Sequence, residues 1–242
     1  CRKAGLKPDI TVIVATIRAL KMHGGVAKDD LKGENVAAVE SGFANLKRHI
    51  ANVRKFGVPV LVTVNKFSSD TSAEMAALDR LCKAEGVDCV VADNWGSGGE
   101  GAADLARAVV RTIDAQPSKF KPLYADELPL AEKVRTIAKE LYGASDITYD
   151  SSVRARFAEL EKEGFGHLPV CIAKTQYSFS TDQNAKGAPS GFTIPIRELR
   201  LSAGAEFVVV VCGDIMTMPG LPKTPAANNI EVGGDGRISG LF

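Results

Sequence analysis

Two loops of this chain each carry a large aromatic residue three positions after the end of an apolar run. Phe67 follows the run at 58–64, and Trp95, the single tryptophan, follows the run at 87–92 in a glycine-rich loop. Glycine lets a backbone approach a ligand closely, and aromatic side chains bind flat rings by stacking. If the two runs are neighbouring strands, Phe67 and Trp95 can form a slot for a flat ring. The alternative is that Trp95 only covers the end of a sheet.

The first of these loops begins with Asn65 and Lys66, a pair that resembles the base-reading loop of GTP-binding proteins. That loop requires an aspartate two positions after the lysine, and this chain has Ser68 there. The sequence therefore argues against guanine recognition and against a GTPase fragment. A plain turn from strand to helix, with Asp70 or Thr71 as the helix cap, is the structural alternative.

A basic segment follows the first apolar run and is expected to be a loop. In it, Arg18, Lys21 and His23 precede Gly24 and Gly25. Two cations, a histidine and a pair of glycines could hold an anion, and Lys21 and His23 are the candidates for that role. A solvated basic turn is the alternative.

Five short apolar runs must form the strands that position these loops. They are rich in Val and Ile and do not alternate with polar residues, which predicts strands covered on both faces, as in parallel sheets. Cys89, Cys171 and Cys212 lie inside these runs and are expected to be small core residues. The runs are 10–15, 58–64, 87–92, 168–173 and 207–212.

Helical patterns lie between the runs. Apolar residues recur at steps of three or four, and one predicted helix opens with a capping box from Thr71 to Glu74. Strands that alternate with helices predict an α/β fold with a mostly parallel sheet and helices on both faces. The predicted helices are 35–56, 71–85, 104–115, 130–141 and 152–163.

The stretch 116–122 is the clearest linker, because it holds two prolines and few apolar residues. It predicts an α/β domain at 1–122, which carries the aromatic loops, and a smaller C-terminal α/β domain at 123–242. The second domain has long irregular stretches that contain Tyr, Phe, Met and Pro, a mixture that argues for functional loops and against disorder. These stretches are 174–182, 187–191 and 213–220.

Composition and missing motifs exclude several function classes. Of the 242 residues, 30 are Lys or Arg and 29 are Asp or Glu, so the net charge of +1 predicts neither nucleic-acid nor membrane binding. The longest apolar run, 207–212, is too short to cross a membrane. The sequence has no zinc-hydrolase or serine-hydrolase motif, no His and Cys spacing of a metal site, and no GxxxxGK[ST] phosphate loop.

The cysteines indicate the redox compartment of the protein, and the first residue indicates whether the chain is part of a longer one. Five cysteines without paired spacing suit a reducing compartment. The chain starts at Cys1 rather than Met and enters its first strand at once, so we expect a piece of a longer polypeptide.

Long strings within these loops make the chain similar to the C-terminal part of the formate–tetrahydrofolate ligases. The likeness runs over the whole chain, and its strings are long and uncommon. They are VATIRALKMHGG at 14–25, NKFSSDT at 65–71, LPVCIAKTQYSFSTD at 168–182, GAPSGFTIP at 187–195 and GDIMTMPGLP at 213–222.

The resemblance implies an ATP-dependent reaction that joins formate to tetrahydrofolate and gives 10-formyltetrahydrofolate, ADP and phosphate through formyl phosphate. It implies Mg²⁺ with ATP, a monovalent cation such as K⁺, and a cytoplasmic homotetramer. The implied sheet is of the P-loop NTPase-like kind and is incomplete in this chain, because the family's ATP-binding glycine loop lies in an N-terminal part that is missing here.

The resemblance also implies roles for particular residues. Phe67 and Trp95 match the pair of aromatic residues that enclose the pterin ring, and Ala188, Pro189 and Ser190 match the loop against which the nucleotide base rests. Catalytic residues stay unknown, with Lys21 and His23 as candidates to hold an anion. The alternative function is a non-catalytic fragment of that fold that binds folate or supports oligomerisation.

Overall fold

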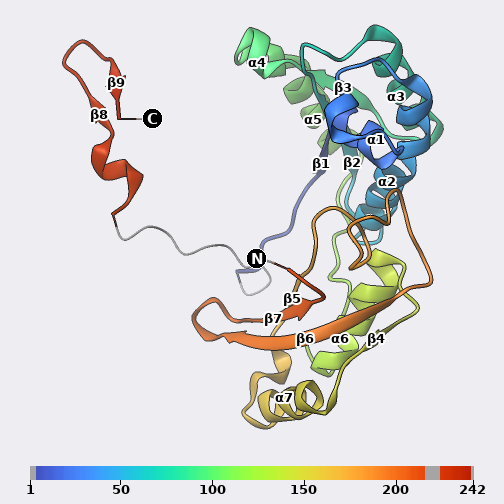
Figure 1. The fold of residues 1–242 in the computed structure, drawn as a ribbon, viewed down its shortest axis with the longest axis vertical. Coiled ribbons are helices and arrows are strands. Elements are labelled where there is room, and N and C mark those ends of the chain that lie inside the picture. The colour runs from blue at the N-terminus through green and yellow to red at the C-terminus, as the bar shows by residue number, and fades with distance from the viewer. Residues whose placement is uncertain (1–3, 216–223, 241–242) are drawn as a thin grey trace.

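The strands of this chain form two larger sheets and a small hairpin. A computed structural model describes residues 4–215 and 224–240, so Cys1 and residues 216–222 of the string at 213–222 lie outside the described residues. The two sheets belong to two units that lie one above the other in Figure 1, and a hairpin of β8 (Glu231–Val232) and β9 (Ile238–Ser239) stands apart from both.

The first sheet is parallel throughout and has the strand order β1-β2-β3. This confirms the first three predicted runs and their parallel arrangement. Asn65 at the end of β2 pairs with Ala92 at the end of β3, so the loops that follow these two strands start side by side. The strands are β1 (Thr11–Ala15), β2 (Val60–Asn65) and β3 (Cys89–Ala92).

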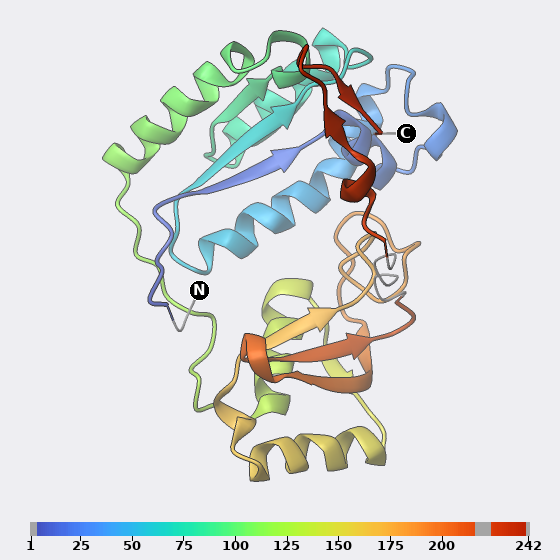
Figure 2. The ribbon, with the colours of Figure 1, turned by 90° about the vertical axis from the view of Figure 1, so that its left-hand side faces the viewer.

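Helices cover both faces of this sheet, as predicted. On one face, α2 (Val36–Arg54) and α3 (Ser72–Ala84) share a core with β1 and β2, and on the other lies α5 (Ala103–Ala115) (Figure 2). The predicted capping box of α3 is present. The cover is incomplete at the edge strand β1, where Val14 is 64% exposed.

A short helix, α1 (Ile17–His23), occupies the segment that the sequence predicts as a loop. Thr16 caps it by accepting a hydrogen bond from the Ala19 N–H at 3.1 Å, and its buried face packs on α2. The two helices approach very closely, because a Cβ atom added to Gly42 of α2 would collide with the carbonyl of Leu20. The prediction of a basic loop at this position is therefore wrong.

The second sheet has the order β4-β6-β7-β5 and is parallel except between β6 and β7. Two of its strands, β4 and β6, do not figure in the prediction. The helices α6, which a π-helical turn at Ala138–Tyr142 continues, and α7 share one core with this sheet. Its elements are α6 (Leu130–Ile137), β4 (Asp146–Thr148), α7 (Ser151–Lys162), β5 (Val170–Ala173), β6 (Thr193–Ser202) and β7 (Phe207–Cys212).

This sheet corrects the prediction that all strands are covered on both faces. Buried and exposed residues alternate along β6, where Ile194, Ile196 and Leu199 face the core. Cys212 is buried as expected, but Cys171 is exposed, because helices cover mainly one face of the sheet. The apolar character of β5 therefore overstates its burial.

The predicted linker passes between the two sheets while it stays attached to the first unit. The Lys119 and Lys121 N–H groups donate to the carbonyls of Gly57 and Phe56 at 2.8 and 3.0 Å, and the rings of Phe56 and Phe120 are stacked. Strands β1–β3 precede residue 122 and β4–β9 follow it. The division into domains at 1–122 and 123–242 stays a prediction.

Candidate functional site

The loops after β2 and β3 are joined at the carboxyl edge of the first sheet. The Lys66 N–H donates to the Ala92 carbonyl at 3.1 Å, and the Lys66 amino group forms an ion pair with Asp93 at 2.9 Å. The hydrogen bond from Lys66, and after it the one from the Gly96 N–H, hold the pKa of Asp93 below its usual value. The backbones that carry Phe67 and Trp95 are thus fixed relative to each other.

Trp95 lies in a one-turn helix, α4 (Asn94–Ser97), which Asp93 caps. Its side chain is 96% exposed. A ring that covered the end of the sheet would be buried, so this exposure argues against the covering alternative. An exposed tryptophan that a capped helix holds in place is a surface available to a flat ligand.

Phe67 is half-buried, and one of its ring faces is already occupied. The Arg18 guanidinium lies 4.3 Å from the ring centroid, and the Phe67 N–H donates to Asp70 at 2.9 Å. Ring contacts among the described residues do not include a direct pair of Phe67 and Trp95. The edge therefore offers two separate aromatic surfaces rather than one stacked pair.

Lys21 has a different place from the one the sequence suggested. Its amino group is fully buried, forms an ion pair with Glu74 at 2.9 Å and donates to the Gly33 carbonyl at 2.9 Å. Burial alone would raise the pKa of Glu74, but hydrogen bonds from Asn35, Lys21 and Thr71 outweigh it and lower that pKa. Lys21 thus ties α1 to the start of α3, and the structure gives no support to an anion-holding role.

His23 faces the second unit, and its role as an anion-holding residue stays a prediction. Gly24 and Gly25, its neighbours, already donate their N–H groups to carbonyls of α1. The His23 Nδ1 atom accepts a hydrogen bond from the Gly187 N–H at 3.2 Å. The side chain thereby joins the first unit to the loop at 187–191.

The 187–191 loop is attached to α2 by further hydrogen bonds. Asn45 donates to the Gly187 carbonyl at 3.0 Å, and Arg48 donates to the carbonyls of Ala188 and Pro189 at 3.3 and 3.4 Å. Ala188 and Pro189 are half-buried, whereas Ser190 is exposed. The loop therefore has a fixed backbone and a small, partly apolar outer surface.

Helix α1 connects the two groups of residues that the sequence predicted. Arg18 in its first turn contacts Phe67, and His23 in its last turn contacts Gly187. A helix of this length is about 10 Å long, so the Phe67 loop and the 187–191 loop lie at opposite ends of one short, rigid element.

Sequence reasoning missed the polar stripe of α2. Asn45 and Arg48 contact the 187–191 loop, Arg48 also donates to Tyr142, and Asn52 donates to Leu141, at 3.0 and 2.8 Å. These positions recur at steps of three and four, as the apolar stripe of the same helix does. Asn and Arg at that spacing were the available signal for a second packed face.

The loop at 174–182 is organised around the half-buried amino group of Lys174. Lys174 donates to the carbonyls of Thr175, Ser178 and Ser180, and burial lowers its pKa to about 8. Beside this loop lies a cavity of about 290 Å³ at the junction of the two units. It is lined by His23, Asn45, His49, Tyr142, Ile172, Lys174, Thr175, Gln176, Ser178 and Phe179.

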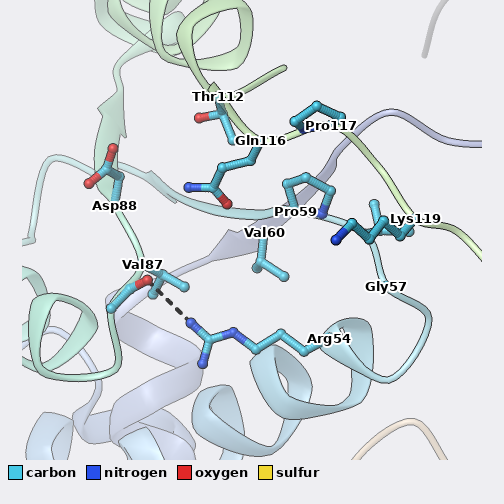
Figure 3. A pocket seen from close by; sticks show the side chains of 12 residues that line it. Arg54, Gly57, Pro59, Val60, Val87, Asp88, Thr112, Gln116, Pro117 and Lys119 are labelled. Carbon is cyan, nitrogen blue, oxygen red and sulfur yellow. Dashed lines mark hydrogen bonds between the residues drawn. The ribbon is translucent and has the colours of Figure 1, made fainter. Parts of the chain in front are cut away.

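A cavity of about 310 Å³ at the opposite edge of the first sheet is not a candidate. It lies where β2 and β3 begin, whereas α/β folds bind ligands at the carboxyl ends of their strands. Figure 3 shows the Arg54 side chain reaching across it, and its guanidinium donates to the carbonyls of Glu85 and Gly86 at 2.8 and 3.2 Å. This arginine joins the end of α2 to the turn before β3.

Residues 4–215 and 224–240 contain no group of three or more His, Cys, Asp or Glu residues that could hold a metal ion. Helices long and apolar enough to cross a membrane are likewise missing from these residues.

Known proteins are similar to this chain over its whole length. A family model described as formate–tetrahydrofolate ligase matches residues 1–242. Curated relatives with that same name include proteins of Granulibacter bethesdensis, 68% identical over 242 residues, Roseobacter denitrificans, 56% identical, and Paracoccus denitrificans, 57% identical. Each match covers all of this chain but only 42–43% of the relative, so the chain spans less than half the length of these relatives.

Proposed function

This chain belongs to the formate–tetrahydrofolate ligase family, and from that premise we propose that it supplies the pterin-binding and base-binding surfaces of such a ligase. The complete enzyme would join formate to tetrahydrofolate with ATP and release ADP and phosphate. The observation that carries the proposal is the exposed Trp95 ring beside the Phe67 loop, at the edge where α/β proteins bind ligands.

The proposed reaction activates formate before the carbon–nitrogen bond forms. A formate oxygen attacks the γ-phosphorus of ATP, ADP leaves, and formyl phosphate results. N10 of tetrahydrofolate then attacks the formyl carbon, phosphate leaves, and N10 loses its proton. Formate alone is a poor acyl donor, so its oxygen must first become part of a phosphate leaving group.

The phosphate-transferring groups are proposed to lie in the part of the ligase that this chain does not cover. The chain has no phosphate loop motif, and we assign none of its residues to Mg²⁺ or to the monovalent cation such as K⁺. Backbone N–H groups and a lysine usually neutralise a transferring phosphoryl group. The 242-residue chain by itself should therefore not release ADP from ATP in a formate-dependent and folate-dependent manner.

The pterin is proposed to bind at Phe67 and Trp95. A pterin is flat and has two π-faces, and the edge offers two aromatic surfaces on loops that Lys66 and Asp93 fix to each other. The nucleotide base is proposed to rest on Ala188, Pro189 and Ser190. That loop is small, and its backbone position is set by hydrogen bonds rather than by its own side chains.

Replacement of Trp95 tests the pterin surface. In a complete ligase that contains this chain, Trp95→Ala should weaken tetrahydrofolate binding by about 5- to 150-fold, because stacking on one ring is worth about 1–3 kcal/mol. Trp95→Phe should keep most of the affinity, and ATP binding should not change. Calorimetric titration measures all of these.

The control is Val110→Ala, which trims another exposed apolar side chain, on α5. If Trp95→Ala binds tetrahydrofolate as tightly as this control does, the pterin surface lies elsewhere. If the complete ligase binds tetrahydrofolate but forms no 10-formyltetrahydrofolate, the non-catalytic alternative replaces the proposed reaction.

We further propose that the complete enzyme is a cytoplasmic homotetramer, as the resemblance implies. The state of the cysteines supports a reducing compartment, since Cys82, Cys89, Cys171 and Cys212 are all free. Light scattering on the complete ligase tests the tetramer.

A further inference from the structure

The contact between His23 and Gly187 sets a condition on the imidazole ring. The Gly187 N–H donates to the Nδ1 atom at 3.2 Å, and Nδ1 can accept only when it carries no proton. The ring must therefore be neutral, with its proton on Nε2. A protonated ring has an N–H group at Nδ1, which would face the Gly187 N–H directly.

Gly187 is held from two sides by the first unit. Besides the bond from its N–H to His23 in α1, its carbonyl accepts from Asn45 in α2 at 3.0 Å. Its φ angle of 69° lies in the left-handed region that favours glycine. Helices α1 and α2 thus both hold the 187–191 loop at its first residue, Gly187.

We infer that His23 is a positioning residue, which places the 187–191 loop through the Gly187 N–H and releases it when the imidazole takes up a proton. This inference rests on the proposed binding of the nucleotide base to Ala188, Pro189 and Ser190. His23 is proposed to touch neither the base nor the reacting atoms. It acts through the backbone of the loop.

The groups around His23 favour its neutral form. From the second unit, Lys186 and Lys174 face it, and α2 contributes His49. All three are cationic or can become so. Burial, and after it the charge of Lys186, lower the pKa of His23 below its usual value of 6.5. The contact is therefore kept at neutral pH and lost as the pH falls below that lowered pKa.

Two substitutions of His23 separate the acceptor from the titration. The side-chain oxygen of Asn can take the place of Nδ1 as an acceptor and does not titrate, so His23→Asn should keep the loop in place at every pH. His23→Leu removes the acceptor altogether. Asn52→Ala is the matched control. Asn52 lies on the polar stripe of α2 that also carries Asn45, but it donates to the Leu141 carbonyl and not to the 187–191 loop.

The experiment uses the complete ligase that contains this chain and has two readouts. At pH 7.5, hydrogen–deuterium exchange by mass spectrometry should show faster exchange of the peptide at 183–191 in His23→Leu, and unchanged exchange in His23→Asn and Asn52→Ala. The KM for ATP should rise about 2- to 10-fold in His23→Leu, the effect of one lost hydrogen bond. The Kd for tetrahydrofolate should not change.

The pH profile gives a signature that a merely structural role would not produce. From pH 7.5 to pH 5, the KM for ATP of the wild type should rise relative to that of His23→Asn, which lacks the titrating ring. Parallel profiles of the two proteins would overturn the inference. Unchanged exchange at 183–191 in His23→Leu would overturn it as well.

Ser190→Trp, which crowds the same loop without touching its anchors, separates this inference from the proposed function. If Ser190→Trp raises the KM for ATP and His23→Leu does not, the loop binds the base but His23 does not position it. If neither variant changes the KM for ATP while exchange rises in His23→Leu, the base-binding proposal is wrong, whereas the positioning of the loop by His23 stands.

Discussion

The edge of the first sheet where β2 and β3 end and the 187–191 loop differ in how their surfaces are built. At the edge, the Trp95 side chain is almost wholly exposed, and the loops that carry the two aromatic residues are joined to each other. In the 187–191 loop the side chains are small, and three side chains of the other unit hold the backbone. The edge offers rings, whereas the loop offers a fixed backbone.

The two surfaces therefore depend on different residues, so each can be altered by substitutions that leave the other intact. Substitution of a ring at the edge removes exposed aromatic area directly, whereas the position of the loop depends on the side chains that hold its backbone. Helix α1 belongs to both, since Arg18 contacts Phe67 and His23 contacts Gly187. Variants in α1, in the loop and at the edge can therefore test whether the two surfaces are independent.

The largest effect is expected where α1 is fixed to α3. Lys21→Met leaves Glu74 charged and without its cation in the interior, so the free energy of unfolding should fall by about 3–5 kcal/mol. Because α1 moves with respect to both surfaces, tetrahydrofolate and ATP should both bind more weakly. Urea unfolding and calorimetric titration measure these changes.

The exposed pair of Lys83 and Asp79 is the control, and Lys83→Met should lower the free energy of unfolding far less than Lys21→Met does, because solvent screens an exposed pair. The pH dependence gives a second check. The folded-state pKa of Glu74 is lowered, so its stabilising contribution is present above pH 4.5 and is lost as the pH falls through the folded-state pKa. The stability gap between Lys21→Met and the wild type should therefore narrow in acid, and a constant gap would contradict the role of this pair.

A smaller effect is expected from crowding the 187–191 loop. Ser190→Trp should raise the KM for ATP by about tenfold, since exclusion of the base from the loop removes about 1.4 kcal/mol. Tetrahydrofolate binding should stay the same, because Ser190 is exposed and lies apart from the anchors of α1. Steady-state kinetics with each substrate varied in turn separates the two. Equal damage to both substrates would place the base elsewhere.

The smallest effect is expected at the edge. Arg18→Met removes the guanidinium from the face of Phe67, and a contact of this kind is worth about 0.5–1 kcal/mol at an exposed site. Tetrahydrofolate binding should weaken by about 2- to 5-fold, whereas the KM for ATP should not change. A loss of ATP binding in this variant would show that the two ends of α1 are coupled.

The sequence predicts those parts of the fold that are apolar and continuous. All five apolar runs are strands, and Phe207–Cys212 has the predicted bounds. The strand β6 was missed because exposed residues alternate with buried ones along it, so polar side chains such as Arg197 and Arg200 interrupt the apolar pattern. For β4, three residues are too few to give a pattern. Propensity alone does not reveal strands that are covered on one face or are very short.

For the candidate site, the spacing of residues in the sequence indicated which loops carry it, but not which residues its side chains contact. The exposure of Trp95 agrees with a ligand-binding ring, whereas the basic segment at Arg18–His23 is a helix whose lysine is buried. The partners of Lys21 and His23, Glu74 and Gly187, are 53 and 164 positions further along the chain in sequence. Contacts between such distant positions depend on how the units pack, and local sequence patterns do not reveal this packing.

Helix α2 should tolerate few changes in sequence, because three of its faces pack against three different parts of the structure. Its apolar side packs on the first sheet, Gly42 admits the backbone of α1, and Asn45, Arg48 and Asn52 hold the second unit. Insertion or deletion of one residue turns everything after it by about 100°. Such a change would disturb all of these matches at once, so insertions and deletions should be far rarer within Val36–Arg54 than in the loops on either side of it.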